Sequence, residues 1–270
     1  MIREQNDIKL VTGANLERAG VLHGFVGRTG GISQGNFASL NLGLFTEDRP
    51  ENVAENEQRF CQALGVQTLV RVRQVHGRKV LVVDGAVADE KSRRQTESDA
   101  IITDQPGVAL AVLTADCVPI ILFDPARRVA GIAHAGWRGT CLQVAAATVE
   151  SMEKRFGSRP REILAAIGPG VGPCCYTVDE PVIKAAEESF GAEASHLIRR
   201  DHGQAPVFDL LAANRLTLEQ AGLLPEHIES SDLCTSCRPD LFFSHRRDRG
   251  KTGRQINFVM LQSADSLRQV

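Results

Sequence analysis

The hydrophobic and polar positions of this chain alternate between strand-like and helix-like patterns. Residues 108–113 and 118–123 are nearly continuous apolar runs, which are typical of strands buried on both faces. Residues 129–133 form a third such run, which leads directly into His134. Residues 140–156 place apolar side chains at helical spacing and predict one amphipathic helix. The order of these elements predicts a mixed α/β fold.

Shorter patterns predict further elements. Residues 70–75 and 80–83 have the composition of two short strands, and His76 lies between them. We therefore predict a hairpin-like pair with His76 in its turn. Amphipathic patterns also predict three more helices, at residues 52–64, 180–190 and 210–221.

No repeat of fixed period and no low-complexity segment interrupts the chain. Residues 89–98 are polar and charged like a linker, but strand patterns on both sides indicate a surface excursion. At 270 residues and 43% hydrophobic content, the chain has enough apolar material for a sizeable core. We therefore expect residues 1–270 to form a single domain.

Charge and cysteine content narrow the classes of function. The formal net charge of −2 and a pI near 6.4 provide no basic field for nucleic acid or an anionic membrane, which favours small-molecule chemistry. The first residues lack the apolar core of a signal peptide, and no run approaches the ~18 apolar residues of a membrane span. Seven cysteines, with Cys174 and Cys175 adjacent, make a poor disulfide framework and suit a reducing compartment. We expect a cytoplasmic protein, with a monomer as the working expectation.

Three candidate metal ligands end or interrupt predicted strands: His76, Cys117 and His134. A thiolate and two neutral imidazoles suit Zn²⁺, and three protein ligands leave a fourth position open for water or substrate. Spacing alone leaves open that these side chains are ordinary core residues. The neighbouring residues favour a metal site, because Asp116 directly precedes Cys117 and two glycines follow His134 closely.

Several motifs in order make the sequence resemble the YfiH-like laccase-domain family, formerly described as polyphenol oxidases and also as purine nucleoside phosphorylases. The resemblance covers nearly the whole chain. Its motifs are Arg28-Thr-Gly-Gly-Ile-Ser33, Ser39-Leu-Asn41-Leu, Ser98-Asp-Ala-Ile-Ile-Thr103 and Phe242-Phe-Ser-His-Arg246.

The resemblance implies that His76, Cys117 and His134 bind zinc, or copper in older descriptions. It implies a central β-sandwich of mixed sheets flanked by helices, in agreement with the alternating pattern above. It also implies phosphorolysis of adenosine, inosine and methylthioadenosine to the free base and ribose 1-phosphate or its methylthio analogue, with adenosine deamination alongside. Purine nucleosides and phosphate are thus the expected partners. An open metal position suits deamination, because it can polarise water for attack on the purine.

We also assign catalytic and substrate-binding residues for this expected reaction. Asp116 and Cys117 are the predicted catalytic residues, and Asp116 is the nearest candidate for proton transfer. A guanidinium suits phosphate, so we expect one or two of Arg28, Arg138 and Arg246 to hold that anion, with Arg246 as the first choice. We assign substrate binding to four residues: Arg28, Asn41, Gln74 and Arg246.

Two positions depart from the family pattern. Thr177 stands where relatives often have Glu, and His245 stands where they often have Tyr. The first departure removes a carboxylate, and the second adds a titratable ring, so substrate preference and pH optimum can differ from those of relatives.

Three alternative interpretations stay open. Cys117 could act as a nucleophile activated by a histidine without metal, as in Cys-His hydrolases and transferases. The three ligands could instead hold a structural metal with a closed fourth position. A copper-dependent polyphenol oxidase is less favoured, because seven scattered histidines do not form the ligand clusters of multi-copper oxidases. Cys234-Thr-Ser-Cys237 has CxxC spacing, but a single pair is a weak zinc signal, so we interpret it as a loop pair of thiols.

Overall fold

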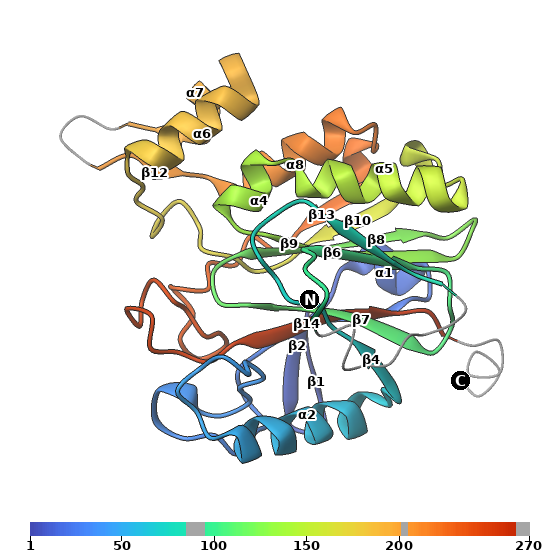
Figure 1. The fold of residues 1–270 in the computed structure, drawn as a ribbon, viewed down its shortest axis with the longest axis vertical. Helices are drawn as coiled ribbons and strands as arrows, with labels where there is room; N and C mark the ends of the chain where they lie inside the picture. Colours follow the sequence, from blue (N-terminus) through green and yellow to red (C-terminus); the bar gives the residue numbers. More distant parts are fainter. Residues whose placement is uncertain (85–94, 201–204, 263–270) are drawn as a thin grey trace.

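Two six-stranded sheets lie face to face in the computed structural model, which describes residues 1–84, 95–200 and 205–262 (Figure 1). The first sheet contains, in spatial order, β1 (Ile2–Gln5), β2 (Ile8–Val11), β3 (Leu22–Val26), β14 (Gln255–Met260), β7 (Val108–Thr114) and β4 (Thr68–Val70). The second contains β13 (Ile228–Ser230), β10 (Leu164–Ile167), β8 (Val118–Asp124), β9 (Val129–Ala135), β6 (Ala100–Thr103) and β5 (Val80–Val83). Each sheet mixes parallel and antiparallel pairs.

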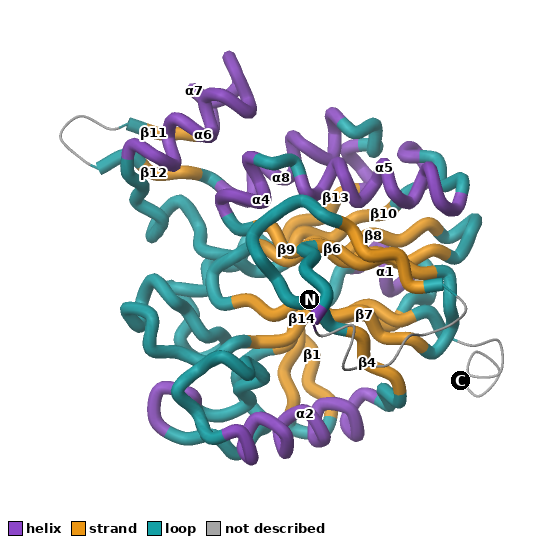
Figure 2. The backbone as a smooth tube through the Cα atoms, in the orientation of Figure 1, coloured by secondary structure: helices purple, strands orange, loops and turns teal. Residues whose placement is uncertain are grey.

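Helices cover the outer face of each sheet (Figure 2). The first sheet is covered by α2 (Pro50–Leu64), and the second by α4 (Trp137–Cys141), α5 (Val144–Phe156) and α8 (Leu210–Gln220). The remaining short elements are α1 (Ala14–Arg18), α6 (Glu180–Phe190), α7 (Ala194–Leu197), the strand pair β11 (Ile198–Arg199) and β12 (Val207–Phe208), and the 3-10 helices Gly35–Phe37, Pro160–Glu162, Gly191–Glu193 and Pro225–His227.

The alternation of side chains along the central strands builds three apolar layers. In β8, Ile121 and Phe123 face the other sheet, whereas Ile120 and Leu122 face the layer of α5 and α8. In β7, alternate residues likewise contribute to the layer between the sheets and to the layer beneath α2. Strands buried on both faces explain the continuous apolar runs in the sequence.

The predicted α/β sandwich flanked by helices is confirmed, and three helices lie within two residues of their predicted bounds. Two local predictions are wrong. The predicted helix 140–156 is two helices, because Gln143 takes a left-handed conformation with φ 62° between α4 and α5. The predicted hairpin around His76 does not form either. β4 pairs with β7 in one sheet and β5 pairs with β6 in the other, so His76 lies on a crossing between the sheets.

The single-domain prediction stays a prediction, and most of the polar stretch 89–98 lies outside the described residues. In the described ranges, no helix combines the length and apolar character needed to cross a membrane.

Strand register brings several chain segments to one end of the sandwich. Val118 pairs with Ala135, and Ala100 pairs with Ala133, so the chain enters β8 and β6 where it leaves β9. β10 runs antiparallel to β8 and therefore leaves the sheet at this same end. Residues 115–117 join this end to the end of β7. Side chains at these strand ends can therefore meet although they are far apart in sequence.

Candidate metal centre

His76, Cys117 and His134 converge at this end of the sandwich. One ligand atom from each lies within 4.8 Å of the others. Cys117 Sγ is 4.0 Å from His76 Nε2, and the two imidazole rings meet edge to face with centroids 4.9 Å apart. His76 is exposed, Cys117 is half-buried and His134 is 3% exposed. The three candidate ligands therefore extend from the buried end of β9 to the protein surface.

Asp99, which sequence reasoning missed as a site residue, orients both histidines. Its fully buried carboxylate accepts hydrogen bonds from His134 Nδ1 at 2.9 Å and from the backbone N–H of His76 at 2.9 Å. The backbone N–H groups of Val75 and Gly77 donate to its other oxygen at 3.2 and 2.7 Å. With Nδ1–H donated to Asp99, His134 Nε2 is left as the ligand atom, which is the usual carboxylate–histidine–metal arrangement. The sequence feature that could have indicated this role is an acidic residue directly before a buried strand.

Cys117 and His134 each stabilise the charged form of the other side chain. Burial raises the pKa of the Cys117 thiol, but the positive charge of His134 outweighs burial and lowers that pKa to about 6. Burial lowers the pKa of His134, but the Cys117 thiolate and the hydrogen bond to Asp99 raise it to about 9. Without a metal, the pocket thus stabilises a thiolate beside an imidazolium, and a metal ion would take the place of the proton on His134 Nε2. A thiolate is the form of cysteine that binds metal.

Glycine next to the group leaves room around the sulfur. A Cβ atom on Gly136 would lie 2.8 Å from Cys117 Sγ and 3.1 Å from His76 Cδ2. Any side chain there would collide with two of the three candidate ligands. The donor set, the carboxylate behind His134 and this cleared space all fit a zinc ion bound by three protein ligands.

Asp116 links the centre to two other loops. Its backbone has φ 91°, an uncommon value for a residue with a side chain, which turns the chain sharply before Cys117. One carboxylate oxygen accepts from Thr235 Oγ1 at 2.6 Å, and the other accepts from the backbone N–H of Arg246 at 2.6 Å. Asp116 therefore positions Arg246. Its predicted role in proton transfer stays a prediction.

The Arg246 side chain is exposed and points along the loop after β10. Its guanidinium donates to the carbonyl and hydroxyl oxygens of Thr177 at 3.0 and 3.1 Å and lies 5.1 Å from the ring centroid of Tyr176. Burial first, and then the negative charge of Cys117, raise the pKa of the Tyr176 hydroxyl. The ring under Arg246 is thus within electrostatic reach of the centre.

Arg254 is a second cation near the centre, and no role was predicted for it from the sequence. Burial lowers the pKa of its guanidinium, while the negative charges of Cys117 and Asp116 act in the opposite direction. Its Nη1 donates to the carbonyls of Thr252 and Gly253 at 3.0 and 2.9 Å. Arg254 therefore adds a second positive charge near the loop that carries the thiol.

The other predicted substrate-binding residues make their hydrogen bonds within the protein. Arg28 Nε donates to Ala38 O at 2.7 Å, and its guanidinium stacks 4.6 Å above the ring of Phe243. The Gln74 amide bonds the backbone N–H and carbonyl of Leu113, both at 2.8 Å.

Asn41 is fully buried and satisfied on both sides of its amide. Its Oδ1 accepts from the backbone N–H groups of Gly43 and Arg254, each at 2.9 Å, and its Nδ2 donates to Thr46 and Asp48 at 3.0 and 2.9 Å. Asn41 thereby fixes the chain next to Arg254. Its assignment to substrate binding stays a prediction.

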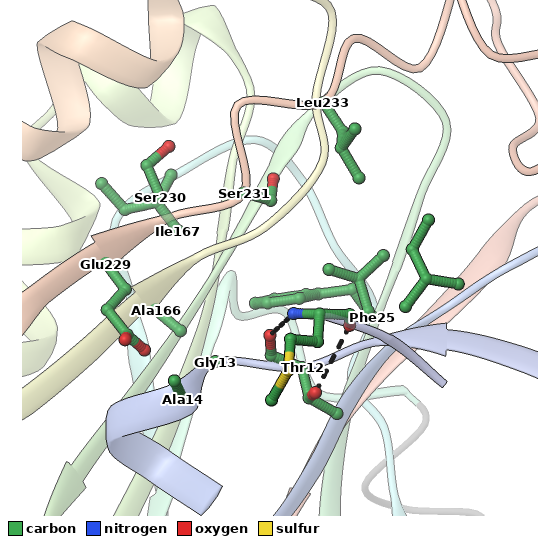
Figure 3. Close-up of a pocket in the computed structure, with 13 residues that line it drawn as sticks. Thr12, Gly13, Ala14, Phe25, Ala166, Ile167, Glu229, Ser230, Ser231 and Leu233 are labelled. Carbon is green, nitrogen blue, oxygen red and sulfur yellow. Dashed lines mark hydrogen bonds between the residues drawn. The ribbon is translucent and has the colours of Figure 1, made fainter. Parts of the chain in front are cut away.

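A cavity of about 410 Å³ lies elsewhere, between the N-terminal strands and the β10–β13 edge (Figure 3). Its walls include Thr12, Phe25, Ala166 and Glu229 and contain no Lys, Arg or His side chain. None of the candidate site residues lines it. The cavity is therefore separate from the metal centre.

Known proteins match the chain over most of its length. A family model described as "Multi-copper polyphenol oxidoreductase laccase" matches residues 22–262. "Purine nucleoside phosphorylase YlmD" of Geobacillus stearothermophilus is 41% identical over 247 residues, which are 89% of this chain and 90% of the relative. "Purine nucleoside phosphorylase YfiH" of Escherichia coli is 36% identical over 235 residues, 87% of this chain and 91% of the relative. The crystal structure of YlmD from Geobacillus stearothermophilus matches with a TM-score of 0.90 at 37% identity and covers 97% of this chain and 98% of that one.

Proposed function

This chain belongs to the YfiH-like laccase-domain family, and from that premise we propose that it is a metal-dependent purine nucleoside phosphorylase. It splits adenosine, inosine and methylthioadenosine with phosphate, releasing the free base and ribose 1-phosphate or its methylthio analogue. Adenosine deamination is the proposed second activity. The names of the relatives support the first reaction at the level of nucleoside phosphorylase.

The convergence of His76, Cys117 and His134 is the observation that carries this proposal. Three ligands of this kind would hold one zinc ion, which supplies Lewis acidity at its open position. Asp99 keeps the imidazole of His134 in the correct orientation and tautomer for that role. Cys117, held as a thiolate, is the anionic ligand.

Arg246 and Arg254 supply the positive charge that phosphate needs. Phosphorolysis requires phosphate to be held beside the ribosyl carbon, which gains positive charge as the base leaves. Arg246 is the better candidate for direct contact, because its guanidinium is exposed and rests on Thr177 through two hydrogen bonds that an anion can replace. Arg254 bonds nearby carbonyls and adds to the local field.

Asp116 serves the site in two proposed ways. It holds the backbone of Arg246, and as the carboxylate adjacent to Cys117 it is the proposed group for proton transfer. For Arg28, Asn41 and Gln74, the proposed contribution to substrate binding is through placement of the surrounding loops, since their polar atoms bond the protein.

A metal-free reaction at Cys117 is the second candidate, favoured by the pKa of about 6 for its thiol. The copper-oxidase alternative has the family description in its favour. However, the described residues contain only one other group of possible metal ligands, and that group has four cysteines and no histidine. It therefore lacks the imidazole ligands typical of multi-copper oxidases.

The test is to quantify metal in the purified protein and incubate it with adenosine, with and without phosphate. Phosphate-dependent adenine and ribose 1-phosphate are the expected products, and inosine formed without phosphate reports deamination. Cys117→Ala is expected to lose one metal ion and both activities, whereas Cys141→Ala, which removes a thiol outside both ligand groups, retains both. Full turnover of a metal-free preparation would favour the thiol mechanism, and absence of phosphate-dependent cleavage of all three nucleosides would refute the proposed function.

A further inference from the structure

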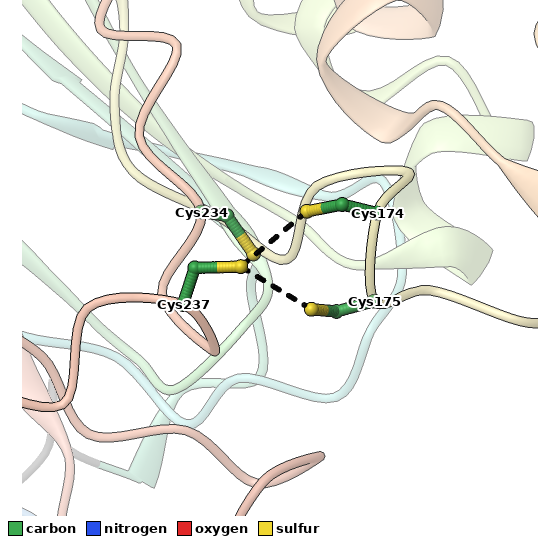
Figure 4. Close-up of side chains that lie close together, drawn as sticks. All are labelled: Cys174, Cys175, Cys234 and Cys237. Carbon is green, nitrogen blue, oxygen red and sulfur yellow. Dashed lines mark hydrogen bonds between the residues drawn. The ribbon is translucent and has the colours of Figure 1, made fainter.

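Four cysteines outside the candidate metal centre meet in space (Figure 4). Cys174 and Cys175 come from the loop after β10, and Cys234 and Cys237 come from the loop after β13. Cys237 Sγ lies 3.5 Å from Cys174 Sγ and 3.4 Å from Cys175 Sγ, and all four sulfurs lie within 4.8 Å of one another.

Strand pairing explains why the two loops meet. β10 and β13 are parallel neighbours, so both leave the sheet at the same end. Their loops continue the pairing: Gly170 N donates to Leu233 O at 3.3 Å, and Thr235 N donates to Gly170 O at 2.9 Å. The rigid sheet therefore places both pairs of thiols side by side.

We propose that Cys174, Cys175, Cys234 and Cys237 form a second metal site, which binds one zinc ion through four thiolates. A tetrahedral zinc ion with Zn–S bonds of about 2.3 Å separates its sulfurs by roughly 3.8 Å. The observed separations of 3.4 and 3.5 Å, with every pair inside 4.8 Å, match such a tetrahedron. On binding, each thiol releases its proton to solvent as its sulfur forms a bond to zinc, and no oxidant or reductant is needed.

The backbone around the sulfurs is arranged for thiolates. Gly172 N donates to Cys234 Sγ at 3.2 Å, and the backbone N–H of Cys237 donates to the same sulfur. An N–H group directed at sulfur stabilises the negative charge that a thiolate ligand carries. A Cβ on Gly172 would lie 3.2 Å from Cys234 Cβ and 3.4 Å from Cys174 Sγ. Glycine therefore allows the donating backbone to approach closely.

A disulfide explains the arrangement less well. A disulfide would bring one pair of sulfurs to about 2.05 Å and leave the other two apart. Here Cys237 Sγ is almost equally distant from two sulfurs, and the fourth sulfur is part of the same group. Convergence of four sulfurs on one point is the expected geometry around an ion. It also corrects the interpretation of Cys234 and Cys237 as an isolated loop pair.

The proposed ion would fasten the loops that hold Arg246. Thr235 lies inside the CxxC segment and donates to Asp116, while Tyr176 and Thr177 directly follow the adjacent cysteines and contact the guanidinium. Four protein ligands leave no open position, so the site is structural.

The test is zinc analysis of the full chain, purified with reductant and washed with a mild chelator. We expect about two zinc ions per chain in the unmodified protein. Cys237→Ala should bind about one, because it removes one of the four ligands of the second site. Cys141→Ala is the matched control and keeps both ions. Because Cys237→Ala could misfold, Cys237→His provides a second variant that replaces the ligand with another zinc ligand and should retain the second ion.

Cys117→Ala allows the proposed four-cysteine site to be measured alone, because it removes a ligand of the other centre and leaves all four of these cysteines in place. X-ray absorption of its remaining zinc should show four sulfurs at about 2.3 Å and no nitrogen. The proposal is overturned if the unmodified protein binds one zinc that is unaffected by Cys237→Ala, or if nitrogen appears in the remaining shell. In a separate preparation purified without reductant, then denatured and freed of zinc, fewer than seven reactive thiols would indicate a disulfide and would also overturn it.

Discussion

The two groups of candidate metal ligands lie at the same end of the sandwich but differ in composition and support. His76, Cys117 and His134 offer one thiol and two imidazoles, whereas the other group offers four thiols. The first is backed by the buried carboxylate of Asp99, and the second is backed by backbone N–H groups. Three mixed ligands favour an open, reactive site, and four thiolates favour a closed, structural one. Loss of the first centre should therefore affect chemistry more than folding, and loss of the second should do the reverse.

His134→Gln should give the largest loss of turnover and so tests the catalytic half of this comparison. Glutamine keeps much of the size and polarity but removes the imidazole ligand. Metal catalysis worth several kcal/mol implies a rate loss of about 10³-fold. The surrounding strands remain, so the thermal midpoint should fall by only a few degrees, as expected for ~1–2 kcal/mol in a chain of this size. Adenosine turnover and a thermal melt on one preparation measure both quantities. Near-normal turnover in folded, zinc-free His134→Gln protein would remove the case for metal catalysis.

Asp99→Asn should give the next largest effect on turnover. The variant keeps the shape of the side chain, but it removes the charge that balances His134 and weakens the bonds to the 75–77 turn. Replacing a carboxylate behind a metal-bound histidine typically costs about 10- to 100-fold in metal affinity or activity. Added zinc should restore part of the lost turnover if Asp99 acts through metal binding. A variant that keeps full metal affinity and activity would show that Asp99 is dispensable for the centre.

The contrast between the two groups also shows what sequence alone could predict. The sequence singled out the three candidate ligands of the first centre, because Cys117 and His134 lie at the ends of long apolar runs and His76 lies between two shorter ones. The fold class was predicted for the same reason, since strands buried on both faces have continuous apolar runs.

Long-range pairing could not be predicted from the sequence. The four-cysteine group depends on β10 lying parallel to β13, which no local pattern shows. The role of Asp99 depends on the crossing of His76 between sheets, which local alternation suggested was a hairpin. The break between α4 and α5 depends on the left-handed conformation of Gln143, a residue with no strong preference for it.

Arg246→Lys tests the part of the comparison that concerns phosphate, which only the open centre is expected to use. Lysine keeps the charge but cannot form paired parallel hydrogen bonds with phosphate. The loss of one charge-assisted hydrogen bond, about 1.5–3 kcal/mol, predicts a rise of at least about 10-fold in the phosphate concentration needed for half-maximal cleavage. Deamination should change much less. Arg249→Lys, at another exposed arginine of the same loop, is the control, and equal loss of both activities in Arg246→Lys would assign Arg246 a structural role.

Cys237→Ala should have the smallest effect on turnover and the largest on stability. The thiol lies outside the open centre, but the proposed zinc joins the loop of Tyr176 and Thr177 to the loop of Thr235, and these loops support Arg246 from two sides. Binding energy of a structural zinc is also folding energy. If only about 3–4 kcal/mol of it is lost, the thermal midpoint should fall by on the order of 10 °C in a chain of this length.

Below that lowered midpoint, the three ligands of the open centre are still held by β8, β9 and Asp99, so turnover should decline by less than about 10-fold, equivalent to 1.4 kcal/mol. This decline in turnover should appear mainly as a higher phosphate concentration needed for half-maximal cleavage. The reason is that loss of the proposed zinc frees the loops around Arg246, whereas the metal ligands of the open centre stay in place. Melts and phosphate titrations of Cys237→Ala and Cys237→His, made side by side, separate these effects. If histidine restores the midpoint while alanine does not, the ion and not the thiol itself provides the stability. If alanine instead abolishes turnover with no change in midpoint, the division between a catalytic and a structural centre is wrong.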